Sequence, residues 1–290
     1  MKWRIRRFDE LASTNDEVKR AIEAGEPEGL AVRALRQTRG YGRQGRAWQS
    51  PAGGLYFSML LRPSAPAGPL STVALVAGLA MRQALLRFVS DDVACRIRVK
   101  WPNDIVVLRD GAGVCSAFHA GAKRGTDFRS AAADGARFLK LCGISSELHR
   151  GALCIGVGVN VAPSPIAAGG KNAPAYLADL SDGSSSERLE DGEGARGEAD
   201  AEKTCAALFE ASLEEFGSLY GRWLREGFAP FARSYGELEA LRGSKVEMAD
   251  LSGGILASGK AAGVADDGRL LLLSDDGSLV PVSSGEAHVL

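Results

Sequence analysis

The sequence predicts an α+β protein that ends in a small all-β domain. As far as about residue 241, apolar runs of strand length alternate with segments of helical periodicity. From Gly243 onward only short strand-like runs remain, separated by Gly-Gly and Asp-Gly pairs that are typical of tight turns. A length of 290 residues allows two domains. We therefore predict one domain over residues 1–241 and a second over residues 242–290.

The overall composition excludes several classes of protein. With 45% hydrophobic and 24% charged residues and a net charge of −1, the chain should fold as an ordinary globule, and it is not basic enough for a general nucleic-acid binder. The longest apolar stretch, residues 73–80, is too short to span a bilayer. The five cysteines show no Cys-x-x-Cys spacing, which argues against a zinc site. The cytoplasm is the simplest location.

Local signals define the individual elements. Thr14 and Glu17 have the spacing of a capping box, so a helix should start at Ser13–Glu17 and end before Gly25. Leu55 to Leu61 is apolar and aromatic over the length of a strand. The other expected elements are strands at 2–8, 30–35, 95–101, 105–108, 138–148 and 153–161, helices at 70–89, 201–226 and 228–235, and five short strands after 243.

Two segments lack any periodic pattern. Residues 110–136 are rich in Gly, Ala, Asp and Arg and should form an insertion or a long hairpin loop. Residues 181–200 have almost no apolar side chain to bury, so we expect a disordered or mobile surface loop there.

Residues 37–58 contain the most informative motif. Glycines at 40, 42 and 45 are interleaved with arginines at 39, 43 and 46, and an apolar strand follows. Glycine allows the backbone to approach a ligand, and arginine offers a fixed cationic fork for phosphate or carboxylate. The motif favours a loop that wraps an anion, although a plain turn with solvated arginines has the same composition.

Four other clusters could carry chemistry, and each has a purely structural alternative. Lys100–Asp104 could present Asn and Asp to a divalent ion or a ribose, or form a simple turn. Lys140 begins a strand three residues before a glycine, yet most such lysines are at the surface. Gly156–Asn160 could accommodate a flat ring or a neighbouring strand. Ser13–Asn15 could bind a small polar ligand or only start a helix.

No Ser-His-Asp or Cys-His set is evident among the three histidines and five cysteines. Any chemistry should therefore depend on positioning and charge stabilisation rather than on a nucleophilic side chain.

Taken together and in order, these motifs resemble the biotin protein ligase family, in its monofunctional type without an N-terminal DNA-binding domain. The resemblance implies a mixed, largely antiparallel sheet with packed helices, followed by a small C-terminal SH3-like β-barrel. The segments that carry it are Ser13-Thr14-Asn15, Gln37, Gly40 to Arg46, Trp48, Ser50-Pro51, Leu55 to Ser58, Lys100 to Asp104, Lys140 to Ile144 and Gly156 to Asn160.

The resemblance implies an ATP-dependent ligase that forms biotinyl-5′-AMP and then transfers biotin to a lysine of a biotin carboxyl carrier domain. ATP and Mg²⁺ would be required, and no DNA or membrane is implied as a partner. The catalytic residues would be Arg43 and Lys140, and Asp104 would help to organise Mg²⁺. Biotin would be bound by Ser13, Thr14, Asn15, Gln37, Tyr41, Gly42, Arg43 and Lys140. ATP or the adenylate would be bound by Gly40, Arg46, Trp48, Asn103 and Asn160.

This chain departs from the family pattern at Tyr41, where the family usually has an arginine, and at Ser145-Ser146, which replace apolar residues. Two alternative functions remain open: a lipoate or octanoate ligase or transferase of the same fold, and a non-catalytic anion-binding module. An exposed sheet edge could pair with the carrier domain or, as a homodimer, with a second copy. The sequence does not identify the carrier protein.

Overall fold

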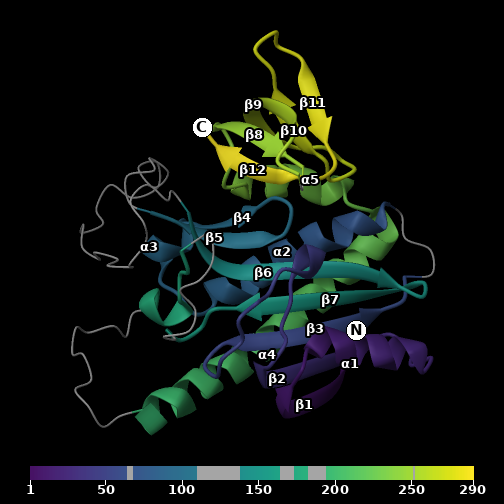
Figure 1. Cartoon of the computed structure of the whole chain (residues 1–290), viewed down its shortest axis with the longest axis vertical. Helices are drawn as coiled ribbons and strands as arrows, with labels where there is room; N and C mark the ends of the chain where they lie inside the picture. The colour runs from purple at the N-terminus through teal and green to yellow at the C-terminus, as the bar shows by residue number, and fades with distance from the viewer. Residues whose placement is uncertain (64–67, 110–137, 164–172, 182–193, 251) are drawn as a thin grey trace.

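The computed structural model describes residues 1–63, 68–109, 138–163, 173–181, 194–250 and 252–290 (Figure 1). Its strands form two sheets, one of seven strands and one of five. No helix within these ranges is both long enough and apolar enough to cross a membrane.

The large sheet has the order β1-β2-β3-β7-β6-β5-β4. Only β1 and β2 pair in parallel; every other neighbouring pair is antiparallel, which confirms the expected mixed, largely antiparallel sheet. The strands are β1 (Arg4–Leu11), β2 (Leu30–Gln37), β3 (Leu55–Leu61), β4 (Ile97–Lys100), β5 (Asp104–Leu108), β6 (Phe138–His149) and β7 (Ala152–Val159).

Helices cover both faces of this sheet, which explains why every residue of β3 and β7 is buried. One face packs against α2 (Val73–Leu86) and α4 (Gly194–Glu226), as Figure 1 shows. The other face packs against α1 (Thr14–Glu23). Because strand side chains alternate between faces, Met59 lies in the first core and its neighbour Leu60 in the second.

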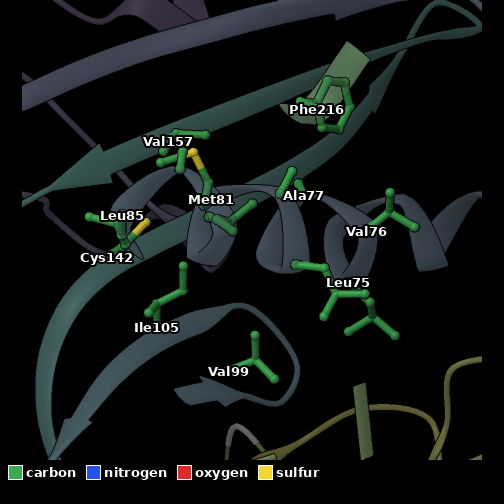
Figure 2. Close-up of a cluster of buried hydrophobic side chains, with 14 of the residues drawn as sticks. Leu75, Val76, Ala77, Met81, Leu85, Val99, Ile105, Cys142, Val157 and Phe216 are labelled. Carbon is green, nitrogen blue, oxygen red and sulfur yellow. The ribbon is translucent and has the colours of Figure 1, made fainter. Parts of the chain in front are cut away.

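Helix α2 lies at the centre of the larger core (Figure 2). It is apolar around most of its circumference because it is enclosed by the sheet on one side and by α4 on the other. Helix α4 presents the predicted stripe, whose members are all buried: Phe209, Leu213, Phe216, Tyr220 and Trp223.

The C-terminal sheet has the order β11-β10-β9-β8-β12 and is entirely antiparallel. Helix α5 (Ala229–Leu238) precedes it and packs against β9. Its strands are β8 (Lys245–Ala249), β9 (Ile255–Val264), β10 (Leu270–Leu273), β11 (Leu279–Val282) and β12 (Glu286–Val289).

Two expectations from the sequence are wrong in detail. Helix α4 begins at Gly194, so residues 194–200 are helical and do not belong to a loop. The polar composition of these residues does not distinguish the first turns of a helix from a loop. The N-cap of α1 is Ser13, whose hydroxyl accepts from the Asn15 backbone N–H, so Thr14 is already helical and does not cap. The insertion expected at 110–136 and the loop at 182–193 lie outside the described residues.

Candidate active site

A cavity of about 950 Å³ lies between the α1 side of the large sheet and the C-terminal sheet. Residues from segments that are far apart in the sequence line it. From the large sheet and its loops these include Ser13–Asn15, Gln37, Tyr41–Arg43, Arg46, Trp48, Lys100–Asp104, Lys140, Gly143–Ser145, Gly156–Gly158 and Asn160. From the C-terminal sheet they include Ala249, Asp250, Ser252, Leu256 and Ser284–Ala287.

Glycines make the floor of the cavity. Gly143 of β6 pairs with Gly158 of β7, and Ser145 pairs with Gly156, so these four residues lie on one face of the sheet. An added Cβ at Gly156 would lie 2.3 Å from Asn15 Oδ1, and one at Gly158 would lie 2.5 Å from the indole nitrogen of Trp48. The alternation of glycine with valine therefore leaves room for side chains that reach over the floor.

One end of the cavity carries neutral hydrogen-bonding groups. Gln37 Oε1 accepts from the Thr14 N–H at 2.8 Å, and its amide nitrogen donates to Ser50 Oγ at 2.8 Å. Asn15 contacts Ser58 Oγ through Oδ1 at 2.6 Å and donates to Ser145 Oγ from Nδ2 at 3.3 Å. These buried groups hold one another in fixed orientations, as a site for a small polar ligand requires.

The glycine/arginine segment forms a small hairpin of its own, which we call the Gly40–Trp48 loop. The Trp48 N–H donates to Gly40 O, and the Gly42 N–H donates to Arg46 O, each at 2.9 Å. At its tip Gln44 and Gly45 both have positive φ, at 59° and 70°. Of the three glycines, only Gly45 therefore adopts a left-handed conformation in this tight reversal.

Arg43 physically joins the two most specific sequence motifs. Its guanidinium donates to Asn103 Oδ1 at 2.8 Å, and Asn103 Nδ2 in turn donates to Ile144 O at 2.9 Å. Burial lowers the pKa of Arg43, while the charge of Asp104 raises it. Arg43 therefore supplies a partly desolvated positive charge beside the turn that contains Asn103 and Asp104.

A second cation lies close by. Lys140 Nζ lies 2.8 Å from Asp104 Oδ1 and 5.2 Å from the centre of the Trp48 ring. The contact with Asp104 is an ion pair without hydrogen-bond geometry, because this buried oxygen has no hydrogen-bond partner. Arg43 and Lys140 both line the cavity, so it has a cationic region beside its neutral end.

Trp48 is the flat ring that lies over the glycine floor. Its six-membered ring would be 2.9 Å from a Cβ at Gly143, and its buried indole N–H has no hydrogen-bond partner among the described residues. The space that the alternating glycines leave is thus taken by a side chain of the Gly40–Trp48 loop itself.

The C-terminal sheet closes the far side of the cavity. Arg46 makes a two-pronged ion pair with Glu286 of β12, with nitrogen–oxygen distances of 3.2 and 2.9 Å. Trp101 Nε1 donates to Gly268 O at 3.0 Å, which ties the Lys100–Asp104 turn to the same sheet. The C-terminal sheet, where the sequence predicts a barrel, therefore contributes residues to the cavity although it is a separate sheet.

The structure brings nearly all of the predicted site residues to this one cavity; only Gly40 is missing from its lining. Gly40 lies behind the loop, where a Cβ would be 2.5 Å from Ser50 Oγ. The Asn160 amide donates to Lys140 O at 2.9 Å. Which ligand each of the predicted site residues binds stays a prediction.

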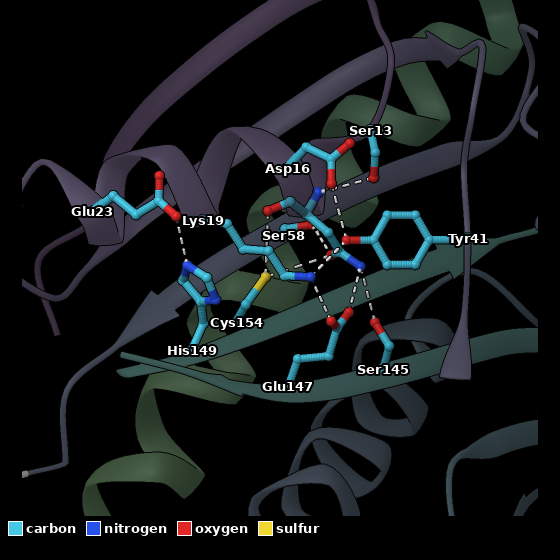
Figure 3. A network of polar contacts seen from close by, with 11 residues as sticks. Ser13, Asp16, Lys19, Glu23, Tyr41, Ser58, Ser145, Glu147, His149 and Cys154 are labelled. Carbon is cyan, nitrogen blue, oxygen red and sulfur yellow. Dashed lines mark hydrogen bonds and ion pairs between the residues drawn. The ribbon is translucent and has the colours of Figure 1, made fainter. Parts of the chain in front are cut away.

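Sequence reasoning missed Asp16, Lys19 and Glu147, which form a charged cluster next to the cavity (Figure 3). The helical spacing of Asp16 and Lys19 places them on one face of α1, and strand alternation places Glu147 on the face of Gly143 and Ser145. The sequence contains both the helical and the strand periodicity. Whether Asp16 and Lys19 meet Glu147, however, depends on how α1 packs on the sheet.

The cavity lies between a mixed sheet and a small β domain and combines neutral hydrogen-bonding groups with two cations, which suits a protein that binds a polar, anionic small molecule. Residues 8–160 match the Biotin/lipoate A/B protein ligase family, and the chain belongs to that family. Residues 243–289 match the Biotin protein ligase C terminal domain, which places it among the biotin protein ligases.

Individual relatives agree with this assignment. The chain is 27% identical over 267 residues to the Bifunctional ligase/repressor BirA of Bacillus subtilis, covering 91% of this chain and 67% of that protein. It is 38% identical over 76 residues to the Biotin--[acetyl-CoA-carboxylase] ligase of Paracoccus denitrificans, covering 26% of this chain and 31% of that protein.

A solved structure shares the fold over the whole chain. The biotin protein ligase from Aquifex aeolicus in complex with biotin and ATP superposes with a TM-score of 0.70 at 23% identity. The superposition covers 99% of this chain and 98% of that one.

Proposed function

We propose that the protein is an ATP-dependent biotin ligase that forms biotinyl-5′-AMP and then transfers biotin to a lysine of a carrier domain. One observation carries the proposal: a neutral hydrogen-bonding pocket and a pair of cations lie in the same cavity. The Gly40–Trp48 loop and the Lys100–Asp104 turn both contribute to it. Biotin has the matching chemistry, with a neutral ureido ring at one end and a carboxylate at the other.

The neutral end suits the ureido ring. Ser13, Thr14, Asn15 and Gln37 offer amide and hydroxyl groups that can both donate and accept. Because Thr14 and Asn15 are buried and already bonded to Ser58 and Ser145, and Gln37 to Thr14 and Ser50, ordering them costs little when the ligand binds. Tyr41 and Gly42 would then lie along the chain that carries the carboxylate.

The cations suit the first reaction. A biotin carboxylate oxygen attacks the α-phosphorus of ATP, the new O–P bond forms, and the bond from this phosphorus to the bridging oxygen breaks as pyrophosphate leaves. Negative charge accumulates on the α-phosphate oxygens during this step. Arg43 and Lys140 are placed to stabilise that charge in a site from which water is partly excluded.

The residues fit a single magnesium ion held mainly by ATP. The described part of the chain contains no group of three His, Cys, Asp or Glu residues that could hold a metal. Asp104 offers one carboxylate, which lies in the cavity lining beside Lys140, and Mg²⁺ is commonly bound by one or two carboxylates together with substrate phosphates. When bound, Mg²⁺ neutralises phosphate charge, and Asp104 would hold it.

In the second reaction the neutral amine of a carrier lysine attacks the acyl carbon of the adenylate. A C–N bond forms, the C–O bond of the mixed anhydride breaks, AMP leaves with the bonding pair, and the amine loses a proton. The mixed anhydride also reacts with water, so a loop that covers it protects it. The name of the Paracoccus relative makes a carrier domain of acetyl-CoA carboxylase the first acceptor to test.

Pyrophosphate exchange into ATP and transfer of biotin to a purified carrier domain test the proposal directly. We expect exchange only when biotin is present, and label on the carrier only when ATP is present as well. Exchange that is independent of biotin, or no exchange at all, would contradict the proposal.

A lipoate ligase is the second candidate, because the family that matches residues 8–160 includes lipoate enzymes by name. The match of residues 243–289 to a biotin protein ligase domain favours biotin. Parallel adenylation assays with biotin and lipoate separate the two functions, and faster activation of lipoate would support the second.

A further inference from the structure

Besides the packing of Trp48 beside Lys140, three polar side-chain contacts connect the Gly40–Trp48 loop to different parts of the molecule. Arg43 contacts Asn103 in the β4–β5 turn, and Arg46 contacts Glu286 in the C-terminal sheet. Both of these arginines face the cavity and are candidates for binding phosphate. The third contact joins Tyr41 to Asp16 and Lys19 of α1, which do not line the cavity, so it needs a separate explanation.

The Tyr41 hydroxyl is held from two sides (Figure 3). It donates to Asp16 Oδ1 at 3.0 Å and accepts from Lys19 Nζ at 2.9 Å. Lys19 Nζ also lies 5.2 Å from the centre of the Tyr41 ring. Burial raises the pKa of Tyr41 to about 12, so the hydroxyl stays protonated and can both donate and accept at neutral pH.

Lys19 links this contact to the sheet. Its ammonium lies 2.5 Å from Glu147 Oε2 on β6, and the other oxygen of Glu147 accepts from Asn15 Nδ2 at 3.4 Å. Burial by itself lowers the pKa of Lys19, but its hydrogen bonds to Glu147 and Tyr41 outweigh burial and raise it. A half-buried ammonium with two hydrogen-bonded partners has one well-defined position.

We propose that Lys19 is a positioning residue for the proposed reaction: acting through the Tyr41 hydroxyl, with Asp16 and Glu147, it fastens the Gly40–Trp48 loop over the biotin end of the cavity before any ligand binds. We call this set the Lys19 latch. The loop backbone is then already in place when biotin arrives. The conformational entropy of the loop is lost during folding, so biotin binding does not have to order the loop.

The latch predicts a specific kinetic pattern. If the loop opens in a variant, only the fraction of molecules with a closed loop binds biotin well, so the apparent affinity falls by that fraction. Arg43 and Lys140 remain, and the chemical step in the closed complex is unchanged. In Lys19→Met, whose altered side chain does not line the cavity, the KM for biotin should therefore rise and more adenylate should be lost to water, while kcat and the KM for ATP stay close to those of the wild type.

The loop contains its own probe, because trypsin can cleave after Arg43 and Arg46. We expect the ligand-free Lys19→Met and Tyr41→Phe variants to be cleaved in the loop on the order of 10-fold faster than the wild type, the scale of one lost hydrogen bond to a charged group. Arg20→Met is the matched control, since Arg20 is the next cation on α1 and pairs with Glu17 instead. Lys19→Arg should restore slow cleavage.

Both residues belong to one latch, so the double variant should be no more sensitive than the single variants. The KM for biotin is compared in Lys19→Met, because Tyr41 itself lines the cavity, and it should rise by a similar factor. Unchanged cleavage of Tyr41→Phe, which is nearly isosteric and should fold, would overturn the proposal, as would additive effects in the double variant.

The test separates this proposal from the proposed function. Cleavage is measured without substrate and reports on the latch whether or not the protein activates biotin. A wild-type protein that forms biotinyl-5′-AMP, together with variants that match it in cleavage and KM, would reject the latch alone.

Discussion

Arg43 is the residue on which the proposed chemistry depends most. Arg43→Ala should slow biotin-dependent pyrophosphate exchange by about 100-fold or more, the scale of losing one donor to a transition-state oxyanion. The measurement is the exchange rate at saturating biotin and ATP.

Arg39→Ala is the matched control, because Arg39 precedes the same loop but does not line the cavity. Its rate should stay within about twofold of the wild type, as is usual for surface substitutions. An unchanged rate in Arg43→Ala, or equal losses in both variants, would remove Arg43 from the mechanism.

Gly158 shows how little room the cavity floor leaves. In Gly158→Ala the new methyl group would lie 2.5 Å from Trp48 Nε1, so the indole must leave the floor. We expect a loss of stability of about 1–3 kcal/mol, which is typical of overpacking. We also expect a higher KM for ATP, because Trp48 is one of the residues predicted to bind ATP. Urea unfolding and steady-state kinetics measure the two effects, and normal kinetics would argue against that role for Trp48.

At the scale of elements, helix α4 contains a glycine that the fold does not require. A Cβ at Gly221 would meet only Arg225 Nη1, at 3.8 Å. Gly221→Ala should therefore stabilise the protein by roughly 0.5–1 kcal/mol, the usual difference between the two residues in a helix. A higher urea midpoint with unchanged catalytic rates is the expected result.

Gly243→Ala provides the opposite case, because Gly243 has a φ of +80°, which an alanine adopts only with strain. It should destabilise the protein by about 1 kcal/mol. If both variants moved the midpoint in the same direction, backbone conformation would not explain either effect.

The elements also show where sequence reasoning succeeds. Strand β3 was predicted at its observed bounds because an apolar, aromatic run of seven residues between polar loops has few other solutions. Sequence reasoning misses the first residues of α4 because their polar composition is also that of a loop, and it places the N-cap of α1 one residue too late because Ser13 and Thr14 are both good capping residues.

At the scale of the whole molecule, Glu239 lies where the chain leaves α5 for the C-terminal sheet. It is 4% exposed and accepts from the backbone N–H groups of Trp101 and Leu241. Burial raises its pKa to about 7, although these hydrogen bonds oppose the shift. A buried carboxyl group thus joins the Lys100–Asp104 turn to the link between the two sheets.

This pKa predicts how stability depends on pH. Because the folded-state pKa is raised from 4.5 to about 7, the folded protein binds more protons than the unfolded chain in that window, and stability falls as the pH rises through it. The total loss is on the order of 3 kcal/mol. Glu239→Gln should lose this pH dependence, so urea unfolding at pH 5 and pH 8 should show the variant gaining on the wild type at the higher pH.

Glu237→Gln is the control, because Glu237 is exposed and pairs with Arg233 on the surface of α5. Its stability should follow the wild type at both pH values. If the wild-type protein and the Glu239→Gln variant had parallel pH profiles, folding would not raise the pKa of Glu239.

By itself the sequence determined the class of fold, most of the elements and the residues of the motifs, because periodicity, turn residues and motif order are local properties of the chain. It also pointed to the family, since the glycine/arginine segment and Lys100–Asp104 occur together and in order. Only the tertiary structure decided that Arg43 meets Asn103, that Trp48 covers Gly158, and that Lys19 reaches Tyr41 and Glu147. Each of these contacts joins residues on different elements, and their meeting depends on strand register and helix packing, which no local pattern encodes.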